Sequence, residues 1–306
     1  MSRYVGVRLI QSVAVLVLAT IVAFALLHLA GDPVQLMLGD MATPEDVTRL
    51  RRELGLDRPL AVQYWRWLRG AVGGDVGQSI RYQQPAARLV AERLPASLLL
   101  AATAMGIAVA AGVPLGILGA LFRNSWIDHL VRTIAVLGQS IPFFWLALMF
   151  IVLFSVQLEW LPTSGYGTWR HLVMPAVTLS TLSMARIARL LRSSLLDVLN
   201  EDYVRTAHGK GLDPSRVVLR HALKNAALPV ITVIALQLGA VFGGAVITET
   251  IFAWPGIGRL SIDAAVSRDY PLFQGIVVLT AITFVLLNLT TDLLYAVLDP
   301  RIRYSS

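Results

Sequence analysis

The chain contains no cysteine and few charged residues. Among its 306 residues, Asp, Glu, Lys and Arg make up 15%, against about 25% in a typical soluble domain, and 56% are hydrophobic. The absence of cysteine excludes disulfides and thiolate metal sites. The low charge and the large hydrophobic share place the chain among integral membrane proteins.

Motifs of covalent chemistry and of nucleotide binding are also missing. The five histidines are scattered, and neither a His-Glu-x-x-His pair nor a Gly-x-Ser-x-Gly turn occurs. The run GAVGGDVGQS has Val72 and Gln78 where a phosphate-binding loop requires glycine and lysine. We therefore expect no catalytic residue, no metal site and no bound cofactor in this chain.

Long apolar runs dominate the sequence instead. A membrane-spanning helix needs about 20 mostly apolar residues to cross about 30 Å of hydrocarbon. Six runs predict such helices, at about residues 9–30, 97–121, 131–157, 172–192, 226–248 and 274–298. The first run resembles a secretory signal, but its apolar part is long, so we expect it to remain as an anchor. The predicted fold is all-α, with six transmembrane helices.

Lysine and arginine gather in alternate connections between these runs. Fourteen of the 26 basic residues, against six of the 19 acidic ones, fall on the side that holds both termini and residues 193–225. Short cytoplasmic loops collect Lys and Arg, so we expect both termini and this segment in the cytoplasm. Without the short run 172–192, the basic C-terminal tail would lie outside. The charge distribution therefore supports six spans.

One acidic residue falls inside a predicted span. Asp292 lies about two turns within the last run, where a charge costs roughly 2.5–3.5 kcal/mol on insertion scales. We expect it to pair with Arg186 or Arg189, at the cytoplasmic end of the run 172–192. Arg186, Arg189 and Arg192 recur every third residue, as in a voltage sensor, but they are better interpreted as the polar end of a helix that continues into water.

The chain is expected to divide into two parts. Residues 1–95 form the anchor helix and an extracytoplasmic loop, and residues 96–306 form a five-helix transmembrane core with a cytoplasmic loop at about 193–225. Within the outer loop, Thr43 can cap a helix that begins at Pro44 and ends at Gly55. The following run, PLAVQYWRWLRG, is rich in aromatic residues that suit a membrane surface.

The segment 193–225 is too polar to cross the membrane. It predicts two short helices, one from about Asn200 to Gly211 and one capped by Asp213 with Pro214 in its first turn. A basic helix-turn-helix can bind DNA, but spans tether both ends of this one and its charge follows from its location, so we expect no nucleic acid partner. A bent element between two spans suits the transmission of motion from a cytoplasmic partner.

This segment also carries a family resemblance. DYVRTAHGKGLDPSRVVLRHALKNAALPVIT resembles the cytoplasmic loop of the membrane subunits of binding-protein-dependent ABC importers, in the dipeptide/oligopeptide permease B branch. Arg205, Thr206 and Ala207 occupy the family's Glu-Ala-Ala positions, with arginine in place of glutamate, and Gly211 occupies its glycine. The rest of the chain, before and after this segment, contains further motifs that resemble the family's in the same order, namely LAGDP, LGLDRPLAVQYWRWL, LPTSGYG, ETIFAWPGIGRL, RDYP and LLYAVLDPRIRY.

The resemblance implies a type I ABC importer permease fold in the bacterial inner membrane, without enzyme activity in this chain. It implies as partners a second, similar permease subunit, two separate ATPase subunits that bind ATP and magnesium, an extracytoplasmic solute-binding protein and membrane lipids. The ATPase-coupling residues that it implies are Asp202, Tyr203, Arg205, Thr206, Ala207, Lys210, Gly211 and Leu212. Those of an extracytoplasmic family motif are Trp254, Pro255, Gly256 and Gly258.

Alternatives remain for the transported solute and for the mechanism. Di- or oligopeptides are the expected substrates, but importers of nickel and of glutathione share this architecture, and GYGTWRHLVMPAV resembles those branches as well. A self-sufficient secondary transporter is the alternative from another class. It would require ionisable residues within the membrane or an inverted repeat, and the sequence offers Asp292 alone.

Overall fold

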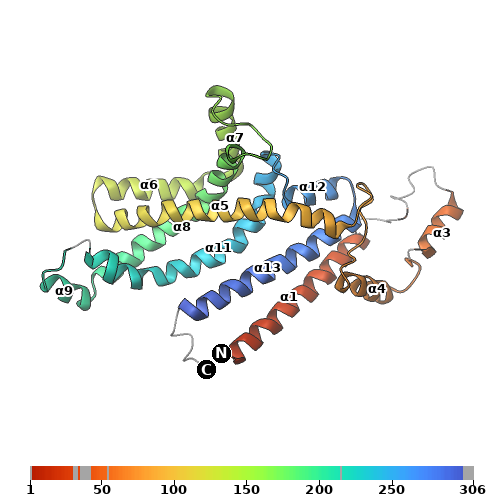
Figure 1. The fold of residues 1–306 in the computed structure, drawn as a ribbon, viewed down its shortest axis with the longest axis horizontal. Coiled ribbons are helices and arrows are strands. Elements are labelled where there is room, and N and C mark those ends of the chain that lie inside the picture. Colours follow the sequence, from red (N-terminus) through yellow and green to blue (C-terminus); the bar gives the residue numbers. More distant parts are fainter. Residues whose placement is uncertain (1, 30–33, 35–42, 54, 214–215, 299–306) are drawn as a thin grey trace. The chain divides into compact units, whose positions relative to one another are not determined.

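The computed structural model describes residues 2–29, 34, 43–53, 55–213 and 216–298 (Figure 1). These residues form helices and no strand, apart from one isolated bridge between Gln78 and Pro85. The helices are α1 (Ser2–Leu29), α3 (Pro44–Glu53), α4 (Leu60–Val72), α5 (Ala86–Leu121), α6 (Trp126–Ser140), α7 (Phe143–Phe150), the π-helix η1 (Ile151–Gln157), α8 (Trp169–Leu199), α9 (Asp202–Gly209), the π-helix η2 (Val217–Ala222), α11 (Leu223–Ile251), α12 (Ile257–Val266) and α13 (Tyr270–Leu298).

The chain divides into two compact units. Unit 1 comprises Met1–Ala96 and Gly256–Leu289, and unit 2 comprises Ser97–Pro255 and Thr290–Ser306. Helix α5 begins in unit 1 and continues in unit 2.

In unit 1, α4 and α13 are tied to α1. The hydroxyl groups of Thr20 and Tyr64 lie 2.9 Å apart, and the Tyr64 ring meets Phe24 edge-on at 5.4 Å. Gln274 of α13 donates a hydrogen bond of 3.2 Å to the Ala23 carbonyl. Because an apolar helix has few polar groups to offer, these bonds select which faces of α1, α4 and α13 meet.

Helix α3 confirms the prediction made for residues 43–55. The Asp46 amide donates to the Thr43 hydroxyl at 3.3 Å, and this hydroxyl donates to the Asp46 carboxylate at 2.6 Å. That side-chain bond holds the pKa of Asp46 below its ordinary value. Gly55, with a φ of +68°, ends the helix in the left-handed conformation that glycine adopts readily.

A buried carboxylate organises the loop of unit 1 that precedes α5. Asp269 is 1% exposed and accepts hydrogen bonds from the Ser79 hydroxyl and from the amides of Ile80 and Arg81, each at 3.1 Å. It also accepts the Leu272 amide of α13 at 3.3 Å. One side chain thereby joins the loop before α5 to the start of α13.

In unit 2, α8 packs against α5, α6 and α11. Glycines on α5 allow its backbone to approach α8 closely. A Cβ atom at Gly112 would lie 2.9 Å from the Met184 carbonyl oxygen, and one at Gly116 would lie 2.9 Å from that of Ala188. Gly-x-x-x-Gly spacing is typical of such close contacts between membrane helices.

The predicted span 131–157 is not a single helix. The structure breaks it into α6 and a second helix, α7 with η1, which are bent by 102° at Ile141 and Pro142. Proline lacks the amide that would continue the helix and disfavours helical dihedrals in the residue before it. Ile141 accordingly has an extended ψ of 122°, and Pro142 has one of 127°.

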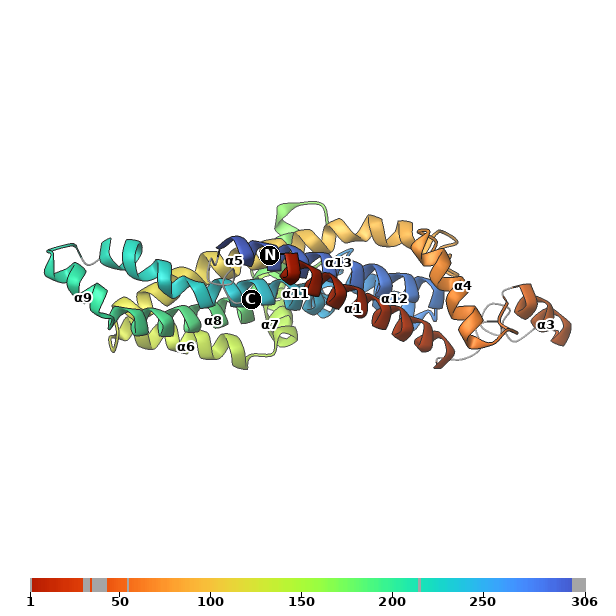
Figure 2. The ribbon, with the colours of Figure 1, turned by 90° about the horizontal axis from the view of Figure 1, so that it is seen from below.

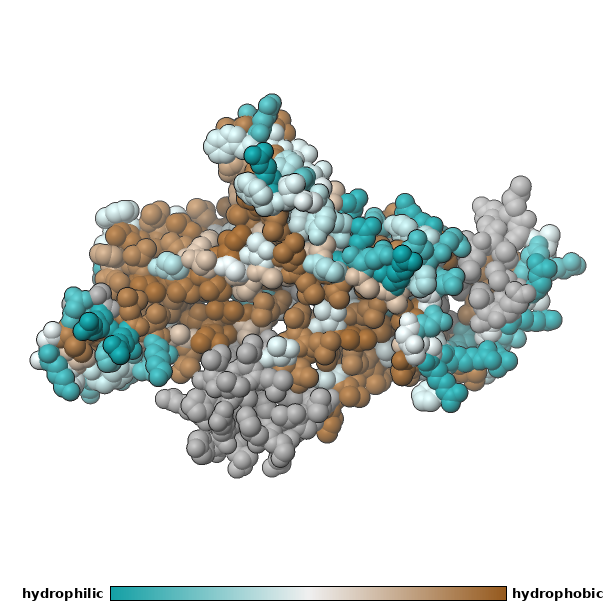
Figure 3. Space-filling view, in the orientation of Figure 1, coloured by the Kyte–Doolittle hydropathy of each residue, from teal (hydrophilic) through white to brown (hydrophobic). Residues whose placement is uncertain are grey.

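Among the described residues, three helical stretches are long and apolar enough to cross a membrane: Ala86–Leu121, Val217–Gly239 and Tyr270–Thr290. The bent pair of α6 and α7–η1 adds a fourth if it counts as one span. Apolar residues cover much of the visible face of unit 2, whereas polar residues gather on α9 (Figure 3).

Candidate functional site

The polar segment between α8 and α11 folds as a short helix, a corner and a π-helical turn. Helix α9 occupies residues 202–209, slightly less than the predicted 200–211. It lies at one end of the pair formed by α8 and α11 (Figures 1 and 2). The segment therefore joins two packed helices of unit 2 through one compact element.

This element has an apolar core of its own. Val204 and Ala207 of α9 and Val217 of η2 are 1%, 8% and 0% exposed. Val198 and Leu212 pack against them. Because a core of apolar side chains resists deformation, α9 is held firmly to η2 and to the end of α8.

The outer face of α9 is polar and exposed. The side chain of Asp202 is 98% exposed and that of Arg205 is 73% exposed, with 3.5 Å between their charged atoms. Thr206, Lys210 and Gly211 are exposed as well, and Tyr203 is 41% exposed. The Tyr203 hydroxyl accepts a hydrogen bond of 2.8 Å from Asn225 of α11. The predicted coupling residues thus divide into an exposed face and a buried one.

The corner after α9 has the geometry expected of its sequence. Gly211 has a φ of +74°, and no atom lies within 4 Å of the position that a Cβ would take. The following Asp213 accepts the Arg216 amide on its carboxylate at 3.4 Å and the Val217 amide on its carbonyl at 3.0 Å. Asp213 therefore caps the next helical turn, as predicted, and Pro214 lies outside the described residues.

Two arginines of α8 connect it to its neighbours. Arg186 donates a hydrogen bond of 3.0 Å to Gln237 of α11. The side chain of Asp292 lies outside the described residues, so its pairing with Arg186 or Arg189 stays a prediction. Arg189 has no ion pair within the described part of the chain.

Arg192 makes an ion pair that sequence analysis missed. Its guanidinium contacts Asp128 of α6 through two bonds of 2.6 and 2.8 Å, and Arg132 lies 3.2 Å from the same carboxylate. Asp128 is 0% exposed and also accepts the Asn124 amide at 3.0 Å. The available signal in the sequence was Ser125, three residues before Asp128, because this spacing of serine and an acidic residue is typical of the start of a helix. The pair fixes α6 to the end of α8 that leads into α9.

The ETIFAWPGIGRL motif forms a buried turn in unit 2 and a helix start in unit 1. Trp254 is 1% exposed, and its ring meets Tyr166 edge-on at 4.8 Å. Glu249 is 0% exposed and accepts a hydrogen bond of 2.6 Å from Ser97 of α5. Pro255 follows at the end of that unit. Gly256 caps α12, and Gly258 lies in its first turn.

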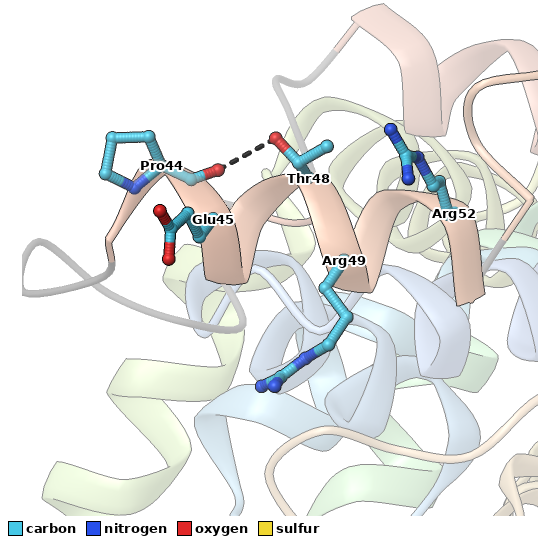
Figure 4. A pocket seen from close by; sticks show the side chains of 5 residues that line it. All are labelled: Pro44, Glu45, Thr48, Arg49 and Arg52. Atoms are coloured by element: carbon cyan, nitrogen blue, oxygen red, sulfur yellow. Dashed lines mark hydrogen bonds between the residues drawn. The ribbon is translucent and has the colours of Figure 1, made fainter.

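A hollow of about 490 Å³ lies along α3, lined by Pro44, Glu45, Thr48, Arg49 and Arg52 (Figure 4). Its lining comes from one helix, and the Thr48 hydroxyl is bonded to the Pro44 carbonyl at 2.8 Å. Within the described residues, no three His, Asp or Glu side chains are placed to hold a metal ion.

Comparison with known proteins identifies the family. Residues 112–304 match the family "Binding-protein-dependent transport system inner membrane component". Residues 1–101 match "Binding-prot-dependent transport system membrane comp, N-term". Together these two matches cover most of the chain.

Curated relatives match the chain from end to end. The glutathione transport system permease protein GsiC of Escherichia coli (strain K12) is 43% identical over 305 residues, which cover 99% of this chain and 100% of the relative. The protein of the same name from Salmonella paratyphi A (strain ATCC 9150 / SARB42) is 42% identical over the same shares.

Solved structures share the fold. An inward-facing conformation of the MetNI methionine ABC transporter aligns with a TM-score of 0.60 and 19% identity, covering 69% of this chain and 96% of that one. A crystal structure of an amino acid ABC transporter with histidines aligns with a TM-score of 0.54 and 15% identity, covering 70% and 94%. The chain belongs to the family of binding-protein-dependent transport system inner membrane components, as an inner-membrane permease subunit of an ABC importer in the dipeptide, oligopeptide and nickel branch.

Proposed function

We propose that this permease forms half of the translocation path of its importer, with six membrane spans and both termini in the cytoplasm. The six are α1, α5, the broken span of α6 with α7 and η1, α8, η2 with α11, and α13. A second, similar permease subunit completes the path. The distribution of basic residues supports this count, because an even number of spans is needed to keep both basic termini on the cytoplasmic side.

Helix α9 is the proposed contact with a separate ATPase subunit, which binds ATP and magnesium. The observation that carries this proposal is the division of α9 into two faces. Its polar face, with Arg205 and Thr206, and the adjoining Lys210 are open to a partner. Its apolar face, with Val204 and Ala207, is packed into the core shared with η2. A force on α9 is therefore transmitted to α8 and α11, which supports alternating access across the membrane.

The extracytoplasmic side is the proposed contact with the solute-binding protein. Trp254 and Pro255 precede Gly256, the N-cap residue of α12, and the family resemblance assigns this motif to the outer face. The binding protein selects the solute, so this chain needs no tight substrate site of its own.

We propose a peptide-class substrate, and glutathione, itself a tripeptide, as the first to test. Its support is the 42–43% identity, over the whole chain, to proteins named as glutathione permeases. Other di- and oligopeptides belong to the same chemical class. Nickel is the solute from outside this class that the branch also includes.

The substrate is tested by uptake of labelled glutathione, a labelled dipeptide and nickel in cells that lack this gene. We expect glutathione uptake to disappear and to return when the wild-type gene is restored. If only dipeptide uptake is lost and restored, a dipeptide replaces glutathione as the proposed substrate, and the peptide class stands. Loss and return of nickel uptake alone would reject the peptide class.

The ATPase contact is tested by co-purification of the ATPase with tagged permease. Thr206→Trp should weaken the association about tenfold, because a bulky side chain overpacks the contact. Thr133→Trp on α6 is the matched control, since Thr133 is also exposed and, like Thr206, donates its hydroxyl hydrogen bond at 2.9 Å to the carbonyl four residues earlier. Equal retention by both variants would reject α9 as the contact.

A further inference from the structure

A pocket in unit 2 belongs to none of the functions above. It has a volume of about 400 Å³ and lies between η1 and the first turns of α8. Its lining includes Phe150 at the end of α7, Phe154 of η1, and Val173 and Val177 of α8. Its size is within the range of about 300–1,000 Å³ that is typical of ligand sites. Its lining is apolar except for Arg170.

The walls of this pocket are already in place. The Phe154 carbonyl accepts the amides of Trp160 and Leu161 at 2.9 and 3.1 Å, which folds the loop after η1 back onto η1. The rings of Phe150 and Phe154 pack edge-on at 5.6 Å. Met174, which is 2% exposed, belongs to the core cluster beneath these rings. A ligand therefore enters a formed cavity and does not have to order its walls.

The mouth of the pocket is aromatic and positively charged. Trp160 and Trp169 are 63% and 69% exposed, as is typical of residues at a membrane surface. The Arg170 guanidinium lies 5.8 Å from the centre of the Trp169 ring, and no ion pair to Arg170 occurs within the described residues. Arg170 also stands in the first turn of α8, where the helix dipole is positive and Thr168 makes no side-chain cap.

We propose that this pocket binds one anionic glycerophospholipid, with part of an acyl chain between Phe154 and Val177 and the phosphate at Arg170. An acyl chain matches the apolar walls of the pocket. The unpaired guanidinium at the mouth favours a lipid with net negative charge over a zwitterion. In the orientation proposed above, the lipid belongs to the outer leaflet.

The proposal needs the chain to lie in a membrane but does not depend on which solute is transported. A polar peptide does not suit the apolar lining. This pocket is therefore distinct in function from the translocation path. An apolar side chain of the second permease subunit is the other possible occupant, and the experiments below distinguish it from a lipid.

The first experiment is native mass spectrometry of the full chain in detergent with equal amounts of palmitoyl-oleoyl phosphatidylglycerol and phosphatidylcholine. We expect one tightly held lipid, with phosphatidylglycerol preferred. Arg170→Gln should lower this preference about fivefold, the effect of one cation near an anionic headgroup. Arg69→Gln is the matched control and should keep the preference, because Arg69 also lies over a tryptophan, Trp65, at 5.9 Å, but not at this pocket. Equal binding of both lipids, or an unchanged preference in Arg170→Gln, would overturn the proposal.

The second experiment maps the acyl chain with phosphatidylglycerol that carries a photoreactive diazirine in its chain. In the wild type, the label should attach to the peptides that contain Phe150, Phe154 or Val173. Val173→Trp fills the pocket and should abolish this labelling, whereas Val156→Trp, at a site on η1 that is 62% exposed and not in the lining, should not. Labelling elsewhere in the wild type would overturn the proposal even if Val173→Trp does not accumulate. Cross-linking from position 173 to the second permease subunit, with no lipid captured, would assign the pocket to that subunit.

Discussion

Asp128 and Asp269 are single carboxylates that each join segments far apart in the sequence. Asp128 of α6 pairs with Arg192, 64 residues later, and Asp269 accepts the Ser79 hydroxyl, 190 residues earlier. Both carboxylates are at most 1% exposed. A buried carboxylate that loses a partner still carries the free-energy cost of leaving water, but no longer the hydrogen bond or ion pair that offset it. Small substitutions at these carboxylates or their partners should therefore lower stability.

The loss of stability on removing each arginine partner of Asp128 should distinguish a buried ion pair from a surface one. Arg192→Gln should lower the free energy of unfolding by about 3 kcal/mol, because Asp128 stays buried without its bidentate partner. Arg132→Gln should lower it by at most about 1 kcal/mol, since the Arg132 side chain is 46% exposed. Unfolding of the detergent-solubilised chain by a denaturing detergent measures both values. Equal losses would contradict this assignment of the dominant pair.

Changing Asp269 to asparagine should loosen the loop of unit 1 that precedes α5. Asp269→Asn turns an amide group toward backbone N–H donors and should cost about 2 kcal/mol. Hydrogen exchange should therefore accelerate at Ile80 and Arg81, whose amides Asp269 accepts. Asp263→Asn on α12 is the control, because the Asp263 carboxylate makes no ion pair in the described part of the chain. Unchanged exchange in Asp269→Asn would show that the loop is held by other contacts.

At the scale of helices, the close approach of α5 to α8 depends on the absence of side chains. Gly116→Ala would place a Cβ 2.9 Å from both the Ala188 carbonyl oxygen and the Leu191 Cβ, and should lower stability by about 1–3 kcal/mol. Gly106→Ala, on the same helix with open space around it, should be neutral or stabilising by up to about 1 kcal/mol. Thermal unfolding in detergent compares the two. A similar loss in both variants would contradict close packing at Gly116.

Local signals in the sequence predicted several elements correctly. Thr43, Pro44 and Gly55 bound α3 as expected, and Gly211 and Asp213 form the corner after α9. Each of these features depends on residues within a few positions of one another, so propensity and capping rules suffice. The apolar runs likewise predicted helices where α5, α11 and α13 occur.

Features that depend on distant residues were not predictable in this way. The break at Ile141 and Pro142 was missed because the apolar run continues across it, although the proline was the available signal. The pairing of Arg192 with Asp128 requires α6 and α8 to be packed at a particular register. No local pattern specifies that register. The proposed coupling residues were inferred from resemblance to a family, because an exposed polar helix by itself is compatible with many partners.

At the scale of the whole importer, the central claim is that α9 couples ATP hydrolysis in a partner to movement of α8 and α11. Gly211 is the position that tests it with little disturbance of packing, because its φ is +74° and no described atom lies within 4 Å of the position that a Cβ would take. A larger residue in this conformation costs about 1–2 kcal/mol, which corresponds to a factor of about 5–30 in the equilibrium constant between the native corner and other conformations.

The most direct measurement is the amount of solute transported per ATP hydrolysed by the complete importer in proteoliposomes. Gly211→Trp should lower this ratio at least about fivefold while the subunits remain inserted. Gly74→Trp, at a glycine between α4 and α5 with a φ of +88° and equally open surroundings, carries the same strain and should keep the wild-type ratio. A wild-type ratio in Gly211→Trp, or an equal fall in both variants, would contradict α9 as the coupling element.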